Sequence, residues 1–187
     1  MLPRANRERS RRDVSKLKLS GRSAEIQRLV GRSLRAAIDM EKLGERTITV
    51  DCDVIQGDGG TRTASVTGGF IALALACRKL VEDGVLGSSP IRYYVTGVSA
   101  GIVEDTALLD LQYYEDSRAQ VDLNCVMNEM GELIELQVRV MIIGKKKMHY
   151  MLEDMRDSRA KLQRLFTFYQ VMLPASVRVD TIWSMVA

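Results

Sequence analysis

The stretch at residues 47–73, TITVDCDVIQGDGGTRTASVTGGFIAL, decides the fold. Its first part, residues 47–55, is rich in β-branched side chains and alternates polar with apolar positions, which predicts a strand. Glycines break this pattern at residues 57–60. A segment rich in small residues follows from residue 61 to residue 82 and predicts a long helix. A strand that leads through glycines into a helix is typical of proteins that mix both elements in layers.

Further elements are predicted on both sides of this stretch. Ahead of it, apolar residues recur at helical spacing over 23–43, with Ser23 placed as the N-cap and Gly44 as the stop. After Pro90, alternating patterns predict strands over 92–103, 107–113, 121–128 and 132–137, and an amphipathic helix over 148–170. Because no repeat or linker is visible, the sequence predicts one α/β (α+β) domain over residues 1–187.

Composition disfavours several classes of protein. The 187 residues are 46% hydrophobic and 27% charged, as in an ordinary globular domain and unlike a disordered or fibrous chain. The three cysteines form no CxxC pair and His149 is the single histidine, which disfavours disulfides, zinc sites and histidine-based triads. No apolar run reaches the roughly 18 residues of a membrane span, and the start is basic. We therefore expect no membrane contact and a cytoplasmic location.

Positive charge is concentrated at the start of the chain. The net charge is only +3, but Arg and Lys dominate residues 1–35. Residues 1–22 are polar and weakly patterned, and we interpret them as a basic arm that includes Arg4, Arg7 and Arg9. Such an arm suits the phosphate backbone of a nucleic acid. A solvated surface tail fits the same charge pattern equally well.

The turn Gly59-Gly60-Thr61-Arg62-Thr63 is the first candidate site. Glycine lets the backbone approach a ligand closely, and the free N–H groups at a helix start favour an anion. Arg62 adds a fork of donors that fits phosphate. The sequence lacks the Lys-Ser/Thr pair of a P-loop and the third glycine of the dinucleotide fingerprint. A tight turn without any ligand is therefore the alternative interpretation. Arg22, just before the predicted helix 23–43, is either a second phosphate clamp or a surface arginine.

The second candidate site is a group of carboxylates. Asp116, next to Glu115, and Asp122 flank a short polar break in the predicted strand region. Two carboxylates can hold Mg²⁺ while waters and a substrate phosphate complete its shell, and one of them can act as a general acid on a leaving oxygen. Acids in solvated loops are the commoner case. The spacing alone leaves both interpretations open.

Taken together, these segments resemble the ribonuclease PH family. The resemblance covers residues 1–137 almost without a break, including the predicted core 23–137, and DCDVIQGDGGTRTAS (51–65) is very specific for the family. The other matching stretches are GRSAEIQRLVGRSLRAAIDMEKLGE (21–45), GVSAGIV (97–103), LLDLQYYEDSRAQVDLNCVM (108–127) and IELQ (134–137).

The resemblance implies a reaction, a fold and an assembly. Family members use inorganic phosphate to attack the 3′-terminal phosphodiester of tRNA precursors and other RNAs, and they release nucleoside diphosphates. The implied fold is that of domain 2 of ribosomal protein S5, and the implied assembly is a homo-hexameric ring. We therefore expect a phosphorolytic 3′–5′ exoribonuclease, that is, a tRNA nucleotidyltransferase. The alternatives are a catalytically inactive fragment or a ring subunit that retains RNA and phosphate binding.

The resemblance also implies roles for single residues. The attacking phosphate would bind through Gly60, Thr61 and Arg62, with Arg22 as a second contact. The carboxylates that hold Mg²⁺ or act as the catalytic acid would be Asp116 and Asp122. The cations that line the RNA path would be Arg4, Arg7 and Arg9. Because phosphate itself is the nucleophile, no Ser, Cys or His nucleophile is required.

The chain departs from the family pattern in two places. Family members begin well upstream of Met1, so we expect a truncated copy that lacks the first strands of the sheet. After Gln137 the family continues with a Gly-Thr-(Gly/Ala)-Glu-like turn, whereas this chain has VRVMIIGKKK (138–147). A reading-frame slip would explain that segment, since a family-like DNA string read one base out of register encodes it. Sequencing the coding DNA tests this; the alternative is a true variant strand. The tail 171–187 finds no match.

Overall fold

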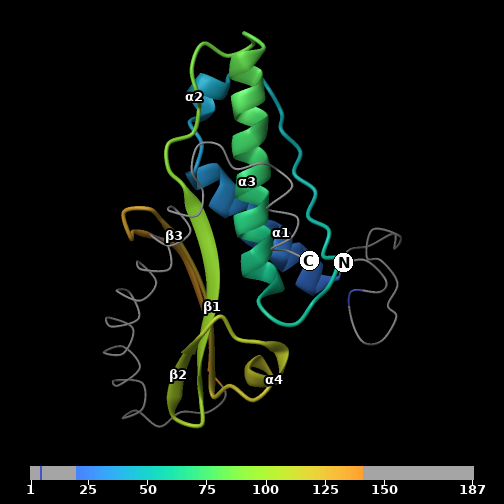
Figure 1. The fold of residues 1–187 in the computed structure, drawn as a ribbon, viewed down its shortest axis with the longest axis vertical. Coiled ribbons are helices and arrows are strands. Elements are labelled where there is room, and N and C mark those ends of the chain that lie inside the picture. Colours follow the sequence, from blue (N-terminus) through green and yellow to red (C-terminus); the bar gives the residue numbers. More distant parts are fainter. Residues whose placement is uncertain (1–4, 6–19, 141–187) are drawn as a thin grey trace. The chain divides into compact units, whose positions relative to one another are not determined.

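The computed structural model describes Ala5 and residues 20–140. Two long helices lie on one face of a four-stranded antiparallel sheet (Figure 1). The elements in chain order are α1 (Gly21–Ala36), α2 (Met40–Leu43), α3 (Thr61–Glu82), β1 (Val95–Val103), β2 (Thr106–Leu109), α4 (Tyr113–Asp116), β3 (Val121–Asn128) and β4 (Leu133–Val140). The predicted helix 148–170 and the tail 171–187 lie outside the described residues.

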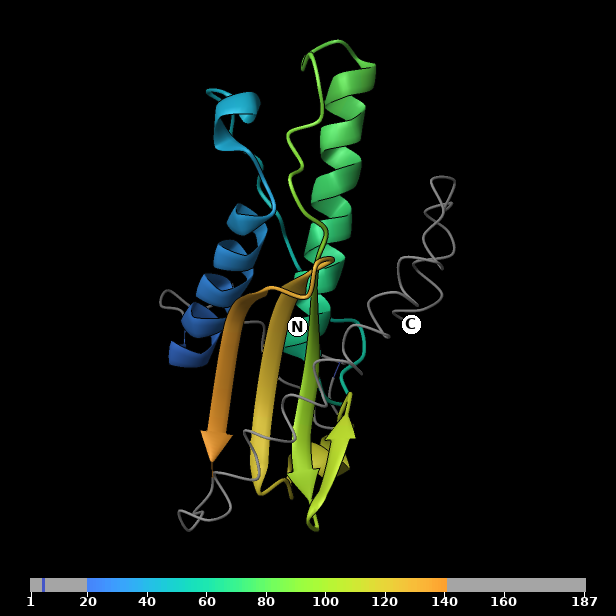
Figure 2. The same ribbon diagram turned by 90° about the vertical axis from the view of Figure 1, so that its left-hand side faces the viewer.

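The four strands are arranged in the order β2-β1-β3-β4, and each neighbouring pair is antiparallel (Figure 2). The predicted strand 121–128 is confirmed, and β4 runs past Gln137 to Val140. In the turn between them, the side-chain oxygen of Asn128 accepts hydrogen bonds from the backbone N–H groups of Met130 and Glu132 at 3.1 and 2.9 Å. This turn fixes the register in which β4 lies along β3.

The predicted strand 107–113 is wrong in its second half. Strand β2 ends at Leu109, and residues that follow form the short helix α4. Gln112 and Glu115 make a capping box at its start, in which the backbone N–H of Gln112 donates to the Glu115 carboxylate at 3.1 Å. A capping box satisfies two N–H groups that a strand would have to pair elsewhere, and it therefore favours a helix here.

The predicted helix 23–43 is in fact two helices. Ser20 rather than Ser23 caps α1, because its hydroxyl accepts from the backbone N–H of Ser23 at 3.1 Å. Helix α1 ends at Ala36, and the carboxylate of Asp39 then accepts from the first backbone N–H groups of α2. A side chain that binds the N–H groups just after it favours a new helix start over continuation of the old one.

The predicted strand 47–55 is also wrong, since this segment pairs with none of the described strands. Its side chains do alternate between exposed and half-buried positions. The half-buried side chains of Val50 and Cys52 lie 3.5 Å from the point where a Cβ on Gly69 of α3 would sit. The alternation therefore reflects one face that rests on α3 and not a hydrogen-bonded ladder.

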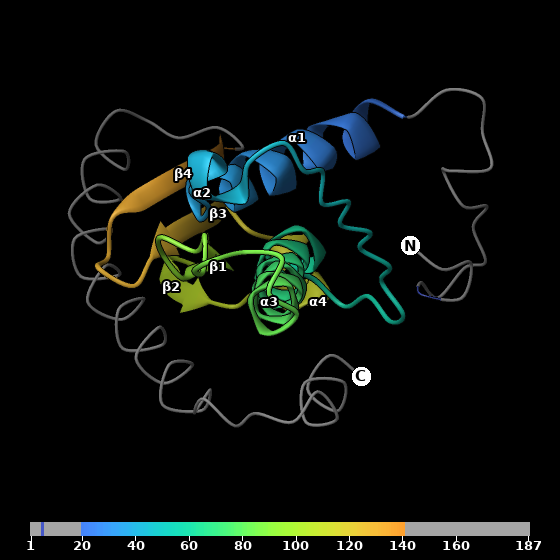
Figure 3. The same ribbon diagram turned by 90° about the horizontal axis from the view of Figure 1, so that it is seen from above.

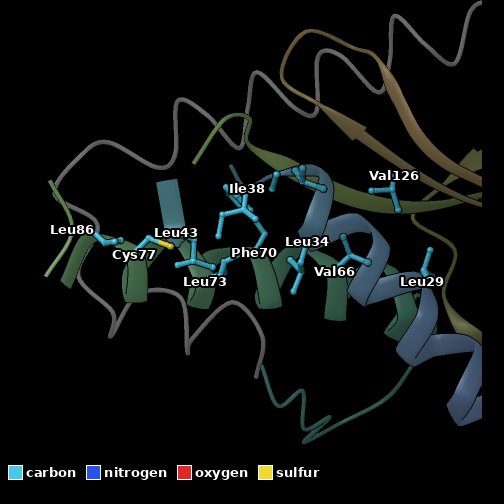
Figure 4. Close-up of a cluster of buried hydrophobic side chains, with 12 residues drawn as sticks. Leu29, Leu34, Ile38, Leu43, Val66, Phe70, Leu73, Cys77, Leu86 and Val126 are labelled. Atoms are coloured by element: carbon cyan, nitrogen blue, oxygen red, sulfur yellow. The ribbon is translucent and has the colours of Figure 1, made fainter. Parts of the chain in front are cut away.

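The core lies between the sheet and the helices. Figure 3 shows α1 and α3 on the same side of the sheet. A cluster of buried apolar side chains joins both helices to β3; its members include Leu29, Leu34, Phe70, Leu73 and Val126 (Figure 4). Gly97 of β1 lets α3 come close, because a Cβ there would lie 3.0 Å from the carbonyl oxygen of Thr63. The first turn of α3 is thus held directly on the sheet.

Helix α3 meets the length and composition of a membrane span, contrary to the expectation that the sequence holds no such run. It has 22 residues, and its mean hydropathy reaches 1.5. Its buried side chains, among them Val66, Phe70 and Cys77, face the core described above. This packing is that of a core helix, and the absence of membrane contact stays a prediction.

Candidate active site

The glycine turn brings the start of α3 to one end of the sheet. Gly60 is the N-cap and adopts the left-handed conformation, with φ 56° and ψ 14°. The hydroxyl of Thr63 donates to the Gly60 carbonyl at 2.8 Å, which holds the turn closed. As a glycine, the N-cap residue itself has no side chain to cap the helix start. A helix start without a capping side chain presents N–H donors and partial positive charge, both of which favour an anion.

Gly59 places the same turn in direct contact with the start of α4, which Figure 1 draws close to the first turn of α3. Its φ is 130°, and a Cβ there would lie 2.3 Å from the carbonyl oxygen of Leu111 and 2.9 Å from the backbone nitrogen of Tyr113. Only glycine fits such an approach. Because α4 ends at Asp116, this contact links the glycine turn to the helix that carries the first carboxylate.

We expect Gly59→Ala to lower the free energy of unfolding by about 1–3 kcal/mol and to weaken phosphate binding, because the added methyl group must push the turn away from α4. Gly84→Ala is the matched control, since Gly84 also has positive φ, 70°, but open space around its Cβ position. Thermal unfolding and phosphate titration of both variants measure the difference. Equal losses in the two variants would show that the contact with α4 contributes nothing.

The two predicted carboxylates come together at this end of the sheet. Asp116 closes α4, and Asp122 lies half-buried in β3. Burial raises the pKa of Asp122 and the negative charge of Asp116 raises it further, whereas the positive charges of Arg62 and Arg139 lower it. These mutual effects require the groups to be near one another. Together with the contact of Gly59 with the start of α4, these effects place Arg62 of α3, Asp116 of α4 and Asp122 of β3 at one end of the sheet.

A row of polar residues forms the sheet face beneath the turn. Ser99 of β1 lies opposite Asn124 of β3, which lies opposite Gln137 of β4. Directly opposite residues share a face, and the Ser99 hydroxyl oxygen lies 3.4 Å from the Cβ position of Gly60, so the row faces the turn. The Ser99 hydroxyl accepts from the Leu111 N–H at 3.1 Å. The side-chain oxygen of Gln137 is buried and has no hydrogen-bond partner in the described part of the chain.

Sequence reasoning did not single out Ser99, Asn124 or Arg139. One signal was available, because the strand period of two places Asn124 on the same face as Asp122. Arg139 lies opposite Asp122 on β4, but it also lies in the segment 138–147 that departs from the family pattern. The hairpin-like turn at residues 128–131 predicts that β4 lies beside β3, but the sequence pattern did not show the register that sets Arg139 opposite Asp122.

Arg22 lies in the first turn of α1 and is exposed. The contact that links its helix to the glycine turn is made by another residue. Glu25, one turn further along α1, pairs with Arg62 at 4.0 Å. The start of α1 therefore lies near the start of α3, and the role of Arg22 as a second phosphate contact stays a prediction.

The predicted RNA-binding residues Arg4, Arg7 and Arg9 lie outside the described residues. Ala5, which is described, is buried, and its carbonyl accepts from the Gly57 N–H at 2.7 Å. This bond attaches the start of the chain to the loop that leads into the glycine turn.

The two carboxylates fit a hard divalent cation. Within residues 20–140 no group of three or more His, Cys, Asp or Glu side chains is gathered as a metal site, so this pair would leave several positions to waters and substrate oxygens. Mg²⁺ is commonly bound in this way, through one or two carboxylates and phosphate oxygens. The repulsion between Asp116 and Asp122 is what a cation between them would relieve. The binding of Mg²⁺ by this pair stays a prediction.

Comparison with known proteins identifies relatives. Residues 1–79 match the family model described as "3′ exoribonuclease family, domain 1", and residues 93–153 match the model of domain 2 of the same family. Ribonuclease PH of Bacillus velezensis is 58% identical over 138 residues, and Ribonuclease PH of Crocosphaera subtropica is 58% identical over 137 residues. Each alignment covers 73% of this chain and 56% of the relative, so the chain spans little more than half of their length.

Solved structures share the fold. The Archaeoglobus fulgidus exosome with RNA bound to the active site matches with a TM-score of 0.53 and 21% identity, over 79% of this chain and 62% of that chain. An archaeal exosome core matches with a TM-score of 0.51 and 22% identity, over 78% and 64% of the two chains. At such identities the likeness concerns the fold alone, and it confirms the predicted fold class.

The matched ranges include the parts that build the site. The glycine turn with Arg62 lies in the domain 1 match, and Asp116 and Asp122 lie in the domain 2 match. The family resemblance seen in the sequence is thereby confirmed over both parts. The chain belongs to the 3′ exoribonuclease family, and the curated relatives it matches within that family are ribonuclease PH proteins.

Proposed function

We propose that this chain is a phosphorolytic 3′–5′ exoribonuclease, a tRNA nucleotidyltransferase that trims the 3′ ends of tRNA precursors and other RNAs with inorganic phosphate. One observation carries the proposal: a helix start whose N-cap is a glycine, an arginine and a pair of interacting carboxylates lie at one end of the sheet. The names of the curated relatives, Ribonuclease PH, support the same reaction.

In the proposed reaction an oxygen of inorganic phosphate forms a bond to the phosphorus that links the last two nucleotides. The bond from this phosphorus to the O3′ of the preceding nucleotide breaks. The last nucleotide leaves as a nucleoside diphosphate, and the O3′ of the shortened RNA takes up a proton. No group is oxidised or reduced, and no protein side chain acts as the nucleophile.

The start of α3 holds the attacking phosphate in this proposal. The backbone at Gly60 and Thr61 supplies oriented N–H donors, and the guanidinium of Arg62 supplies a charged fork. Arg22 is the proposed second contact. Fixed donors of this kind reduce the repulsion between the attacking anion and the anionic RNA, and they hold the two in line for reaction.

The carboxylates are proposed to act on the leaving oxygen, the O3′ of the shortened RNA. Asp116 and Asp122 are proposed to hold Mg²⁺, which would supply positive charge to the phosphoryl group during transfer. One of the two carboxyl groups is proposed to supply the proton that the departing O3′ takes up. Both roles place the acids beside the leaving oxygen, whereas the phosphate lies at the helix start.

A homo-hexameric ring in the cytoplasm is the proposed form of the protein, with RNA led to the site by the arm that carries Arg4, Arg7 and Arg9. The solved structures that share the fold are named as an exosome and an exosome core, which is consistent with a ring-forming chain. Size-exclusion chromatography with light scattering tests this form. A hexamer has six times the chain mass of 21.0 kDa, and a mass of one chain would contradict the ring.

The reaction is tested with a 5′-labelled single-stranded RNA, inorganic phosphate and Mg²⁺. We expect a ladder of shortened RNA and the release of nucleoside diphosphates, both only when phosphate is present. Release of nucleoside monophosphates without phosphate would show hydrolysis and contradict the proposal. Binding of RNA and phosphate without any shortening would favour the alternative, an inactive fragment or a ring subunit.

A further inference from the structure

Arg139 is a cation of the site that has no role in the function proposed above. It lies in β4 directly opposite Asp122 of β3, and its side chain is exposed. In an antiparallel pair, two directly opposite residues have their side chains on the same face of the sheet. Arg139 therefore lies on the face that carries Asp122.

The other residues of β4 show which face this is. Alternate residues of a strand share a face, so Glu135, Gln137 and Arg139 form one row. Glu135 binds the guanidinium of Arg32 in α1 at 2.6 Å. Gln137 lies opposite Asn124, beneath the glycine turn. The row thus lies on the helix-covered face of the sheet. It begins at Glu135, which contacts α1, and ends at Arg139, opposite Asp122.

The guanidinium of Arg139 is available for a ligand. Within the described residues it makes no ion pair or hydrogen bond, whereas Arg32, Arg78 and Arg92 each pair with a carboxylate. Strand β4 is also the outer strand of the described sheet, next to β3 only. An exposed arginine on an outer strand suits an extended polyanion better than a small enclosed anion, for which the helix start and Arg62 already provide donors.

We propose that Arg139 binds a backbone phosphodiester of the RNA near its 3′ end. The proposal rests on the proposed function, because it takes RNA as the ligand of this face. Two arginines then serve two phosphates: Arg62 binds inorganic phosphate from α3, and Arg139 binds the RNA backbone from β4. Asp122 lies between the two elements and receives the charge of both.

The segment that contains Arg139 departs from the family pattern that the sequence resembles. The Gly-Thr-(Gly/Ala)-Glu-like turn that the resemblance implies after Gln137 would place a threonine at the position of Arg139. Arg139→Thr therefore restores the family-like residue, and Arg139→Lys keeps the charge but loses the guanidinium fork. Arg78→Thr is the matched control, because Arg78 is an exposed arginine near the other end of α3, where it pairs with Glu82.

The test measures binding of a fluorescent single-stranded oligoribonucleotide to the full chain by anisotropy, in EDTA and without phosphate, so that no turnover is needed. We expect Arg139→Thr to raise the dissociation constant about tenfold at low salt. The slope of log K against log salt concentration should become shallower by about 0.7, as for the loss of one phosphate contact on a single strand. Arg139→Lys should keep the slope, and Arg78→Thr should keep both slope and affinity.

A second measurement distinguishes the phosphodiester of RNA from inorganic phosphate as the ligand of Arg139. Calorimetric titration with inorganic phosphate should give the same affinity for Arg139→Thr as for the unchanged chain. Loss of phosphate affinity without loss of RNA affinity would assign Arg139 to inorganic phosphate and overturn the proposal, as would RNA binding equal in all variants. A chain that binds RNA with the expected differences but releases no nucleoside diphosphate would overturn the proposed reaction and leave this inference standing. A chain that binds no RNA overturns both.

Discussion

Arg62→Ala is expected to lower kcat/KM for inorganic phosphate by about 10²–10³-fold, the usual cost of removing one donor aimed at a developing charge. The guanidinium lies in the first turn of α3, and its side chain is 24% exposed. Within the described residues its ion pair is with Glu25, and the 4.0 Å between the two groups is too long for a hydrogen bond. The charge of Arg62 reaches Asp122, so its loss affects the attacking phosphate and the acid pair together.

Steady-state kinetics with varied phosphate and saturating RNA measure this effect. Arg62→Lys should recover part of the rate, because a lysine keeps the charge without the fork. Arg78→Ala removes an exposed arginine of the same helix that pairs with Glu82, and it should leave kcat/KM nearly unchanged. A rate for Arg62→Ala equal to that of the unchanged chain would remove the phosphate site from the start of α3.

Asp122→Asn should lower activity by about 10²–10⁴-fold and, at neutral pH, make the fold more stable. The loss of activity follows from the loss of a carboxylate that holds the cation or supplies the proton. The gain in stability follows from burial, which raises the pKa of Asp122, and from the repulsion by Asp116. Even a half-buried ionised carboxylate beside another carboxylate destabilises the folded state, and an amide of the same shape avoids that cost.

The sign of the pH dependence follows from linkage. A carboxyl group whose folded-state pKa is raised stabilises the fold below its unfolded-state pKa, here near 3.8. That contribution disappears as the pH rises through the folded-state pKa. The advantage of Asp122→Asn in urea unfolding should therefore grow from about pH 3 to pH 8. Asp83→Asn, at an exposed residue that pairs with Lys79 on α3, should show no such growth. A less stable Asp122→Asn at pH 8 would mean that the attraction of Arg62 and Arg139 outweighs burial.

The elements with strong local patterns could be predicted from the sequence. Helix α3 and strand β3 lie where the small-residue run and the alternating run place them. The prediction of a strand at residues 47–55 is wrong. Alternation shows that one face of an extended segment is covered, and it does not show that the backbone pairs with a neighbouring strand. Strand β2 was predicted too long, because the capping box of Gln112 and Glu115 went unrecognised.

The sequence predicted the individual residues of the site but not the contacts that bring them together. The glycine turn with Arg62 has a local signature, and so does the aspartate pair to a lesser degree. The need for glycine at position 59 comes from the backbone of Leu111, far away in the sequence. Arg139 joins the site only through the register of β3 and β4. Such relations depend on tertiary packing, which a single sequence does not display.

The contact at Gly59 has a thermodynamic consequence. No side chain separates the glycine turn from the backbone of Leu111 and Tyr113, so a movement of the turn toward α4 would displace α4. An anion that fixes the turn would also fix α4 and hence the carboxylate at its end. Coupling between two ligands is reciprocal, and phosphate and a divalent cation would then tighten each other's binding by the same factor.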